Sequence, residues 1–308
     1  MPVKIPDGLP AIKVLKRERI SIISERDAFK QDIRPLQIAI INIMPEKCVA
    51  ETQLLRLLSN SPLQVAITLL HPRSHVSKNT PPEHLVKFYG NFDDVKGLRY
   101  DGLAITGAPV GTLDFEEVTY WRELQEVMDW SNSNVYSSLH LCWGAFAGLN
   151  YHYGVPKYVL PEKMFGVFQH RVVKRRNALV NGFDDNFLVP HSRYSCLRRE
   201  DLIKIDSVEI LSESDVAGVY LVSAKNNRRV FVTGHPEYEE LDLKTQYVRD
   251  QGKGLPISIP VNYFPDNNPS RRPLEVRWRA HANLLFGNWL NDVYQNTPFN
   301  LEDLRPIV

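Results

Sequence analysis

The chain has 308 residues, of which 43% are hydrophobic and 24% charged, and its formal net charge is +1. This composition is that of a globular protein with room for a substantial core. A net charge so close to zero excludes an electrostatic case for binding nucleic acid or an anionic membrane surface. No apolar run is long enough to span a bilayer, and residues 1–8 lack the apolar core of a signal peptide, so we expect a cytoplasmic protein. Cys48, Cys142 and Cys196 lack the spacing of a disulfide framework or a zinc site, so no bound metal is predicted.

Residues 1–35 carry several prolines and charges without a sustained hydrophobic period, and they predict an extended arm that packs on the body. One folded domain is expected over residues 36–308. It begins with an apolar, β-branched run at residues 36–43, typical of a strand buried on both faces of a parallel sheet. Leucines at helical spacing in residues 51–60 and a second apolar run at residues 63–70 complete a strand, helix, strand unit, which predicts a right-handed crossover.

The same alternation continues along the chain. Residues 100–111 form a strand that breaks into a Gly- and Pro-rich turn at its carboxyl end, where open α/β sheets bind ligands. The further predicted elements are a short helix around residues 82–88, an amphipathic helix at 115–131, shorter β-like segments at 158–223, a buried strand from 228, a charged helix at 239–252 and a last helix at 277–291.

The pattern changes from strand-like to helix-like at Cys142, within residues 135–149. Such a tight turn presents a nucleophile at the edge of a sheet and at the start of a helix, where backbone N–H groups and the helix dipole stabilise a thiolate. Gly144 is the small residue usually found two positions after the nucleophile. His140 replaces the glycine that is expected two positions before it. A buried thiol that packs a helix against a sheet shows the same pattern, so this stretch alone leaves both interpretations open.

A cysteine nucleophile needs a base within reach and usually a third group that orients the base. A later buried strand ends at His235, with Glu237 two residues further on, and it would lie beside the strand that ends at Cys142. The imidazole and the carboxylate can form a hydrogen bond if Pro236 bends the chain between them. A lone histidine at a strand end is more often structural, but its occurrence together with the cysteine turn and the Gly-rich turn favours a catalytic set.

Three short motifs are similar to the signatures of class I glutamine amidotransferase-like domains: Thr-Gly-Ala-Pro at residues 106–109, Cys-Trp-Gly at 142–144 and Gly-His-Pro-Glu at 234–237. Longer segments resemble the homoserine O-acyltransferase family more closely, and this match covers nearly the whole chain. The resemblance implies a flavodoxin-like three-layer α/β sandwich with a mostly parallel central sheet. The segments that carry the closer resemblance are residues 57–65, 79–85, 190–194, 261–265 and 283–286.

The resemblance implies transfer of an acyl group from coenzyme A to an amino-acid hydroxyl in methionine biosynthesis, with acyl-CoA as a co-substrate and no permanently bound cofactor. Cys142 would carry the acyl group, His235 would act as general base and Glu237 would orient the imidazole. The partners would be small-molecule substrates, and a homodimer is a family-level expectation. By position, the family's other functional residues match Lys47 and Trp143 as oxyanion donors, Lys163, Ser192 and Arg249 as acceptor-binding residues, and Gly111 as the position that discriminates acyl donors.

In this family a glycine at the position of Gly111 goes with succinyl-CoA and a glutamate with acetyl-CoA, since glycine leaves room for a second carboxylate that a glutamate would repel. The resemblance therefore favours homoserine as acceptor and succinyl-CoA as donor.

Phe146 replaces an expected glutamine, and Ala280 and Ala282 stand where serine and glycine are usual, so serine O-acetylation stays open as an alternative. A glutamine amidotransferase or a cysteine hydrolase would use the same three side chains, whereas a non-catalytic binding protein is the weakest hypothesis because all three positions are filled.

Overall fold

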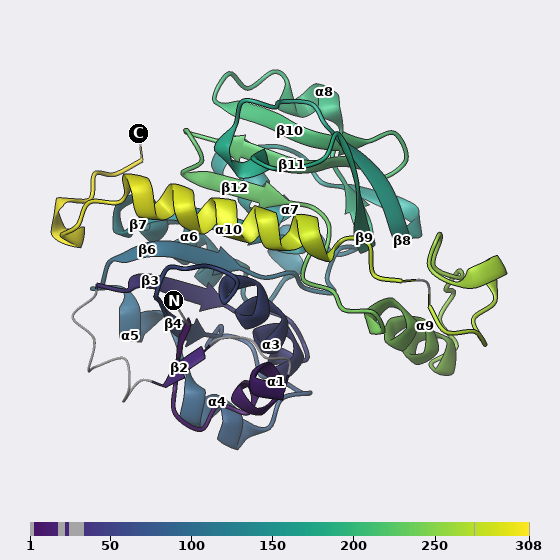
Figure 1. Cartoon of the computed structure of the whole chain (residues 1–308), viewed down its shortest axis with the longest axis horizontal. Coiled ribbons are helices and arrows are strands. Elements are labelled where there is room, and N and C mark those ends of the chain that lie inside the picture. The colour runs from purple at the N-terminus through teal and green to yellow at the C-terminus, as the bar shows by residue number, and fades with distance from the viewer. Residues whose placement is uncertain (1–2, 18–21, 25–33, 274, 308) are drawn as a thin grey trace.

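The computed structural model describes residues 3–17, 22–24, 34–273 and 275–307. Within these ranges a single twelve-stranded sheet runs through the molecule, with helices on both faces (Figure 1). The strands are β1 (Val3–Ile5), β2 (Ile22–Ser24), β3 (Leu36–Ile41), β4 (Val65–Leu70), β5 (Tyr89–Gly90), β6 (Tyr100–Ile105), β7 (Val135–Leu141), β8 (Tyr158–Val172), β9 (Asn186–Cys196), β10 (Val208–Ser214), β11 (Gly218–Ala224) and β12 (Arg229–Val232). The helices are α1 (Ala11–Arg17), α3 (Lys47–Leu58), α4 (Pro82–Phe88), α5 (Phe92–Val95), α6 (Trp121–Asn134), α7 (Trp143–Tyr153), α8 (Arg199–Leu202), α9 (Asp242–Gly252) and α10 (Arg279–Asn296).

The parallel part of the sheet has the strand order β2-β1-β4-β3-β6-β7-β12, with β5 paired to β4. From β12 the sheet continues as the antiparallel strands β11-β10-β8-β9. All six residues of β6 are buried, because helices cover a parallel strand on both faces. The shorter β-like segments expected from residue 158 onwards form the antiparallel extension.

Successive side chains of a strand point to opposite faces of the sheet, and helices cover both faces. Leucines of α3 and α10 pack on the face to which Ile38 and Leu139 point. α6 and α7 pack on the opposite face, against Ala39 and Leu103. None of the helices in the described ranges is both long and apolar enough to cross a membrane. The three layers confirm the mostly parallel, flavodoxin-like α/β class expected from the sequence (Figure 1).

The N-terminal segment is more regular than the extended arm expected from its sequence. β1 pairs with both β2 and β4, so the described part of residues 1–35 extends the parallel sheet. Ile5, Leu9 and Leu15 are buried against the body. Three-residue strands and a seven-residue helix are too short to display a hydrophobic period, which explains why the sequence pattern did not predict them. The division of the chain at residue 35 stays a prediction.

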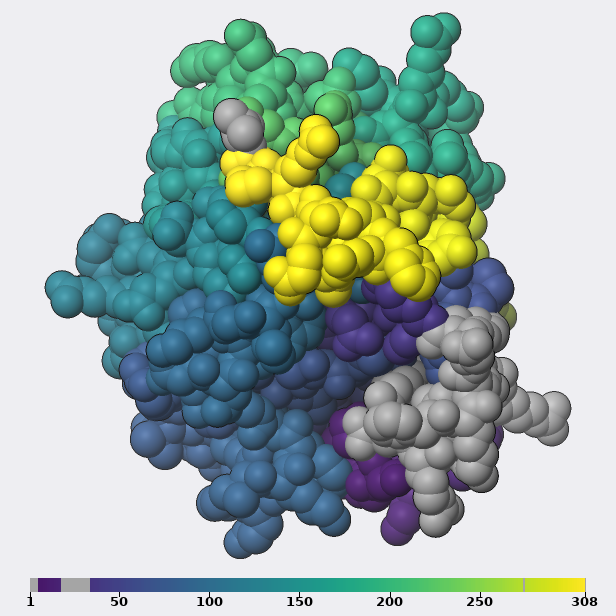
Figure 2. All heavy atoms as spheres, turned by 90° about the vertical axis from the view of Figure 1, so that its left-hand side faces the viewer, coloured from purple at the N-terminus to yellow at the C-terminus, as the bar shows by residue number. Residues whose placement is uncertain are grey.

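The segment that follows α10 lies beside the start of β3, where yellow C-terminal atoms meet purple ones in Figure 2. Arg34 donates a hydrogen bond to the carbonyl oxygen of Pro298 (3.1 Å) and forms an ion pair with Asp101 (2.8 Å). The fully buried Asp101 also accepts from the backbone N–H of Gln37 (2.7 Å). Arg34 and Asp101 thus connect β3, β6 and the C-terminal segment.

Gly102 lets α10 dock directly on β6, and replacing it with alanine should destabilise the fold. A Cβ at this position would lie 2.6 Å from Cδ1 of Ile38 and 2.9 Å from the ring of Trp289, both fully buried. Overpacking of this kind costs about 1–3 kcal/mol, and we expect the free energy of unfolding to fall by that amount in a urea titration followed by tryptophan fluorescence. Gly97→Ala is the control, because its Cβ would meet nothing within 4 Å. Equal midpoints for the two variants would contradict the proposed close packing.

Candidate active site

Cys142 stands at a sharp turn between β7 and α7. Its backbone has φ 46° and ψ −115°, a conformation that side-chain-bearing residues rarely adopt, and its N–H donates to the carbonyl oxygen of Val232 (2.7 Å). Gly144 is required here, because a Cβ would lie 2.7 Å from the carbonyl oxygen of Thr106. The turn has the geometry of a nucleophile elbow, as the sequence predicted.

His140, which replaces a glycine of the usual elbow, is accommodated within the core. Its imidazole is fully buried, its Nε2 lies 3.0 Å from the Ser138 hydroxyl, and its ring packs on Phe231. Gly148 provides the space, since a Cβ there would lie 2.5 Å from Nδ1 of His140. A glycine one turn into α7 therefore compensates for the large residue before the nucleophile.

His235 reaches the same edge of the sheet from the neighbouring strand. β12 pairs with β7 in parallel, with Val232 opposite Leu141, so the residues that follow both strands lie together. The Nδ1 atom of His235 lies 2.6 Å from Oε1 of Glu237, and both side chains are buried. The bend at Pro236 required for this contact is present. Because Nδ1 faces the carboxylate, the other ring nitrogen is left for Cys142.

The electrostatics of His235 favour the imidazolium form. Burial disfavours the charged ring, but the negative charges and hydrogen bonds of Cys142 and Glu237 outweigh it and raise the pKa of His235 to about 10. Tyr238 stacks on the imidazole, with the ring centroids 4.0 Å apart and the planes 13° from parallel. The ring thus has a fixed orientation and holds its proton through the neutral range.

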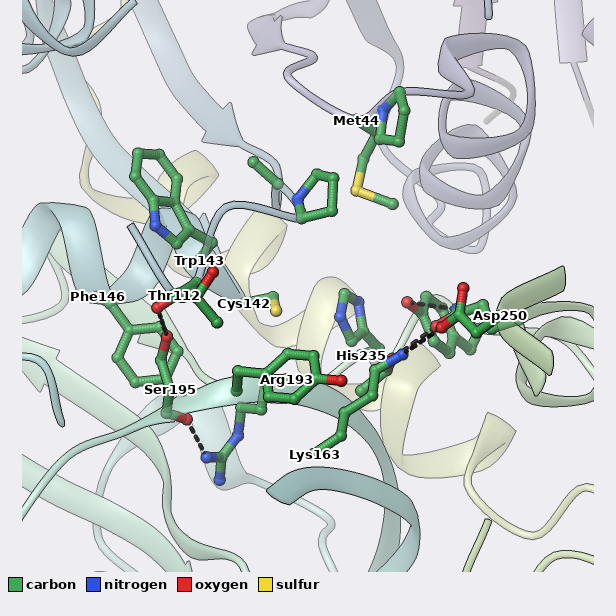
Figure 3. Close-up of a pocket in the computed structure, with 18 of the residues that line it drawn as sticks. Met44, Thr112, Cys142, Trp143, Phe146, Lys163, Arg193, Ser195, His235 and Asp250 are labelled. Carbon is green, nitrogen blue, oxygen red and sulfur yellow. Dashed lines mark hydrogen bonds and ion pairs between the residues drawn. The ribbon is translucent and has the colours of Figure 1, made fainter. Parts of the chain in front are cut away.

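A cavity of about 260 Å³ opens above Cys142 and His235 (Figure 3). In that view Phe146 and Ser195 lie on one side of Cys142, and His235 and Asp250 lie on the other. The cavity brings together most of the residues that the sequence singled out, namely Gly111, Cys142, Trp143, Phe146, Lys163, Ser192, His235 and Arg249.

Four predicted positions do not line the cavity: Glu237, which lies behind His235, and Lys47, Ala280 and Ala282. Lys47 is buried at the start of α3, where its ammonium donates to the carbonyl oxygen of Met44 (3.0 Å) and burial lowers its pKa to about 8. Met44 itself lines the cavity, so Lys47 supports the wall from behind. Ala280 and Ala282 belong to α10, and within the described residues neither contributes to the lining. Of the departures from the family pattern, Phe146 alone touches the cavity.

A charged group lies on the His235 side of the cavity. The Lys163 ammonium is 3.2 Å from Oδ2 of Asp250, and the Arg249 guanidinium donates to Oδ1 of the same carboxylate (2.7 Å). Burial lowers the pKa of Lys163, which Asp250 opposes. The sequence did not indicate Asp250, because this residue of α9 meets Lys163 of β8 only in the folded protein.

Two further residues connect Ser192 with His235. The Ser192 hydroxyl donates to Oε1 of Gln246 (2.5 Å), and Nε2 of Gln246 donates to the Tyr238 hydroxyl (2.9 Å). Since Tyr238 stacks on His235, the chain of contacts runs from Ser192 to the imidazole. Tyr238 directly follows the Gly-His-Pro-Glu motif, which was the available sequence signal, whereas Gln246 had none.

The other side of the cavity holds a buried cation. Arg193 is 5% exposed, its Nε donates to Nδ1 of His191 (3.1 Å), and its guanidinium also donates to the carbonyl oxygens of Ser195 and Ala217. Burial lowers the pKa of Arg193 to about 10, so the group stays charged at neutral pH. These hydrogen bonds use three of its five N–H groups, and among the described residues it forms no ion pair with a carboxylate.

Gly111 is connected to this cation through Ser195. A Cβ at Gly111 would be 2.8 Å from the Ser195 hydroxyl, which in turn donates to the Gly111 carbonyl oxygen (3.0 Å). The Ser195 hydroxyl therefore occupies the place of a side chain at position 111, and any side chain there would have to displace it.

Solved structures show what the fold resembles. A putative GMP synthase protein from Thermoplasma acidophilum superposes with a TM-score of 0.54 at 15% identity, over 85% of this chain and 96% of that chain. A glutamine amidotransferase from Thermotoga maritima gives a TM-score of 0.53 at 10% identity, over 85% and 98%. At such low identity these similarities concern the fold alone, and they confirm the expected class I glutamine amidotransferase-like architecture.

Sequence relatives are far closer. The family model described as homoserine O-succinyltransferase matches residues 2–299. A protein of Acetivibrio thermocellus named homoserine O-acetyltransferase is 58% identical over 99% of this chain and 100% of its own length. A protein of Desulfitobacterium hafniense with the same name is 57% identical over 99% of both chains. Together with the elbow cysteine and its histidine, these matches show that the chain belongs to the homoserine O-succinyltransferase family of acyltransferases.

Proposed function

We propose that the protein transfers an acyl group from coenzyme A to the side-chain hydroxyl of L-homoserine through an acyl-Cys142 intermediate. The observation that carries this proposal is the set of Cys142, His235 and Glu237, held in register by two adjacent parallel strands at the edge of a cavity. Acyl-CoA is the co-substrate, and the proposal requires no permanently bound cofactor.

In the first step, the Cys142 sulfur attacks the thioester carbonyl, the bond to the coenzyme A sulfur breaks, and the His235 imidazolium gives its proton to the departing thiolate. The oxyanion of the tetrahedral intermediate needs hydrogen-bond donors. The backbone N–H of Trp143 is suited to this role, because it is the first of α7 and has no partner within the helix. One such donor is typically worth about 2.7–4 kcal/mol of barrier. Lys47 is the second proposed donor and would have to leave the Met44 carbonyl to reach the oxyanion.

In the second step, neutral His235 takes the proton of the acceptor hydroxyl, the hydroxyl oxygen attacks the acyl carbonyl, and Cys142 leaves as a thiolate beside the imidazolium. Arg249 can hold the acceptor α-carboxylate, and Lys163 and Ser192 can bind its polar groups. The buried position of the nucleophile limits competing attack by water.

Two observations support succinyl-CoA as the donor. Gly111 carries no side chain that could compete with a donor group at this side of the cavity, and among the described residues the buried Arg193 guanidinium has no carboxylate partner, which the distal carboxylate of a succinyl group could supply. One observation favours acetyl-CoA as the donor. The relatives that are 55–58% identical carry the name homoserine O-acetyltransferase. Serine is the competing acceptor, since Phe146 fills part of the cavity wall.

A four-way assay with succinyl-CoA or acetyl-CoA as donor and homoserine or serine as acceptor tests the proposal, with kcat/KM measured for each pair. Incubation with donor alone should add one acyl mass to the peptide that contains Cys142. Absence of the adduct with both donors would refute the two-step mechanism. Glutamine hydrolysis as fast as acyl transfer would favour an amidotransferase instead, and a preference for serine would replace the proposed acceptor.

Gly111→Glu should shift donor preference toward acetyl-CoA. The new side chain would displace the Ser195 hydroxyl, and its carboxylate would compete for Arg193 and repel the carboxylate of a succinyl group. We expect the ratio of kcat/KM for succinyl-CoA to that for acetyl-CoA to fall at least about tenfold, the effect of roughly 1.4 kcal/mol. Gly111→Gln, which has the same size without the charge, separates repulsion from steric blocking. An unchanged ratio in Gly111→Glu would remove the donor argument.

A further inference from the structure

A second cluster of cysteine, glutamate and histidine lies outside the catalytic cavity. Cys48 and Glu51 are one turn apart on α3, and His84 comes from α4. One potential ligand atom from each of the three residues lies within 4.8 Å of the other two. His84 is 33 positions from Glu51, which explains why sequence spacing gave no indication of a metal site.

Glu51 is the unusual member of the cluster. Its side chain is fully buried, and its Oε2 accepts from the Tyr89 hydroxyl (2.9 Å) and lies 3.0 Å from Nε2 of His84. Its Oε1 is equally buried and has no hydrogen-bond partner among the described atoms. A buried carboxylate oxygen without a donor is costly, and it indicates a missing partner for this side chain.

We propose that Cys48, Glu51 and His84 form a zinc site, with Sγ, Oε1 and Nε2 as the ligand atoms. Thiolate, carboxylate and imidazole are the ligand types that zinc takes, and a thiolate with a carboxylate balances the charge of the divalent ion. Zinc at roughly 2.0–2.3 Å from each ligand requires ligand atoms about 3.3–3.8 Å apart. One such atom from each residue already lies within 4.8 Å of the other two, so binding requires a modest closure of the cluster. The Cys48 thiol releases its proton to solvent on binding, and a water completes the tetrahedron.

The surroundings of the cluster have the features of an outer ligand shell. The Tyr89 hydroxyl donates to Oε2 of Glu51 and accepts from Nδ2 of Asn42 (2.9 Å), which holds the carboxylate in place. The same Asn42 amide lies 3.2 Å from the carbonyl oxygen of Lys47, at the first turn of α3. A metal here would join α3 to α4 and brace the loop whose Met44 lines the catalytic cavity. The role is structural, since none of the three ligands lines that cavity.

The test uses cobalt as a spectroscopic substitute for zinc in the full-length Cys142→Ser protein, in which the catalytic thiol cannot compete for metal. After treatment with a chelator, titration with Co²⁺ should give a thiolate-to-cobalt charge-transfer band that saturates at one equivalent. Combining Cys48→Ser with Cys142→Ser should abolish the band. Combining His84→Gln with Cys142→Ser should weaken the binding of Co²⁺ at least about tenfold. Cys196→Ser is the matched control, because Cys196 is also a half-exposed free cysteine and lies on β9.

A second measurement follows stability. Zinc should raise the urea midpoint of the Cys142→Ser protein and leave that of the Cys142→Ser, Cys48→Ser protein unchanged, with circular dichroism to show that both are folded. The proposal is overturned by the absence of a thiolate band, by a band that survives Cys48→Ser, or by equal loss in Cys196→Ser. In any of these cases the cluster is a hydrogen-bonded contact between α3 and α4 that binds no metal.

Discussion

Replacing Cys142 with alanine should abolish the acyl-enzyme and reduce kcat by a factor on the order of 10⁴–10⁶. The expected loss is this large because the sulfur forms and breaks the covalent bond in both proposed steps, and no other described thiol lines the cavity. Release of free coenzyme A, followed with a thiol reagent, measures turnover, and intact-protein mass spectrometry measures the adduct.

Cys196→Ala provides the control for this experiment. Cys196 is the last residue of β9, is partly exposed and does not line the cavity, so its loss should leave both the adduct and turnover intact. An adduct that persists in Cys142→Ala would place the acyl group elsewhere. Turnover that persists without an adduct would indicate direct transfer from coenzyme A to the acceptor.

Glu237→Gln should lower kcat by about 10²–10⁴-fold and move the alkaline limit of acylation to lower pH. The carboxylate lies 2.6 Å from Nδ1 of His235, and its charge and hydrogen bond help to raise the pKa of that imidazole to about 10. A raised pKa means that His235 keeps its proton at neutral pH and loses it as the pH rises through about 10. A neutral glutamine supplies no negative charge to stabilise the imidazolium, whereas the burial that disfavours the charged ring is unchanged. The pKa of His235 must therefore fall.

Single-turnover acylation measured across pH tests this expectation, because protonation of the departing coenzyme A requires the imidazolium. Wild-type acylation should decline only near pH 10, and the decline should begin earlier in Glu237→Gln. Glu239→Gln is the matched control two residues away, where the carboxylate pairs instead with Arg56 and Arg279. Identical pH profiles for wild type and Glu237→Gln would show that Glu237 has no influence on the base.

Local sequence patterns predicted the elements of the parallel sheet well. The run predicted as a buried strand at residues 36–43 became β3, and the change of pattern at Cys142 became an elbow, because each pattern reflects contacts within a few residues. The segment before residue 35 shows the limit of this approach. β1 and α1 are short, and they are held by pairing with β4 and by burial of Ile5 and Leu15 against the body.

By itself, the sequence determined the α/β class, the three motifs and the residues that line much of the cavity, since parallel strands bring their carboxyl ends to one edge regardless of the intervening chain. Only the tertiary structure decided which polar groups meet there. Asp250 pairs with Lys163, Tyr238 stacks on His235, and the buried Arg193 is connected to Gly111 through Ser195. The cluster of Cys48, Glu51 and His84 has the same origin, because it joins residues of α3 to a residue of α4. Such pairings depend on burial and on the removal of competing water, and neither is visible in a linear pattern.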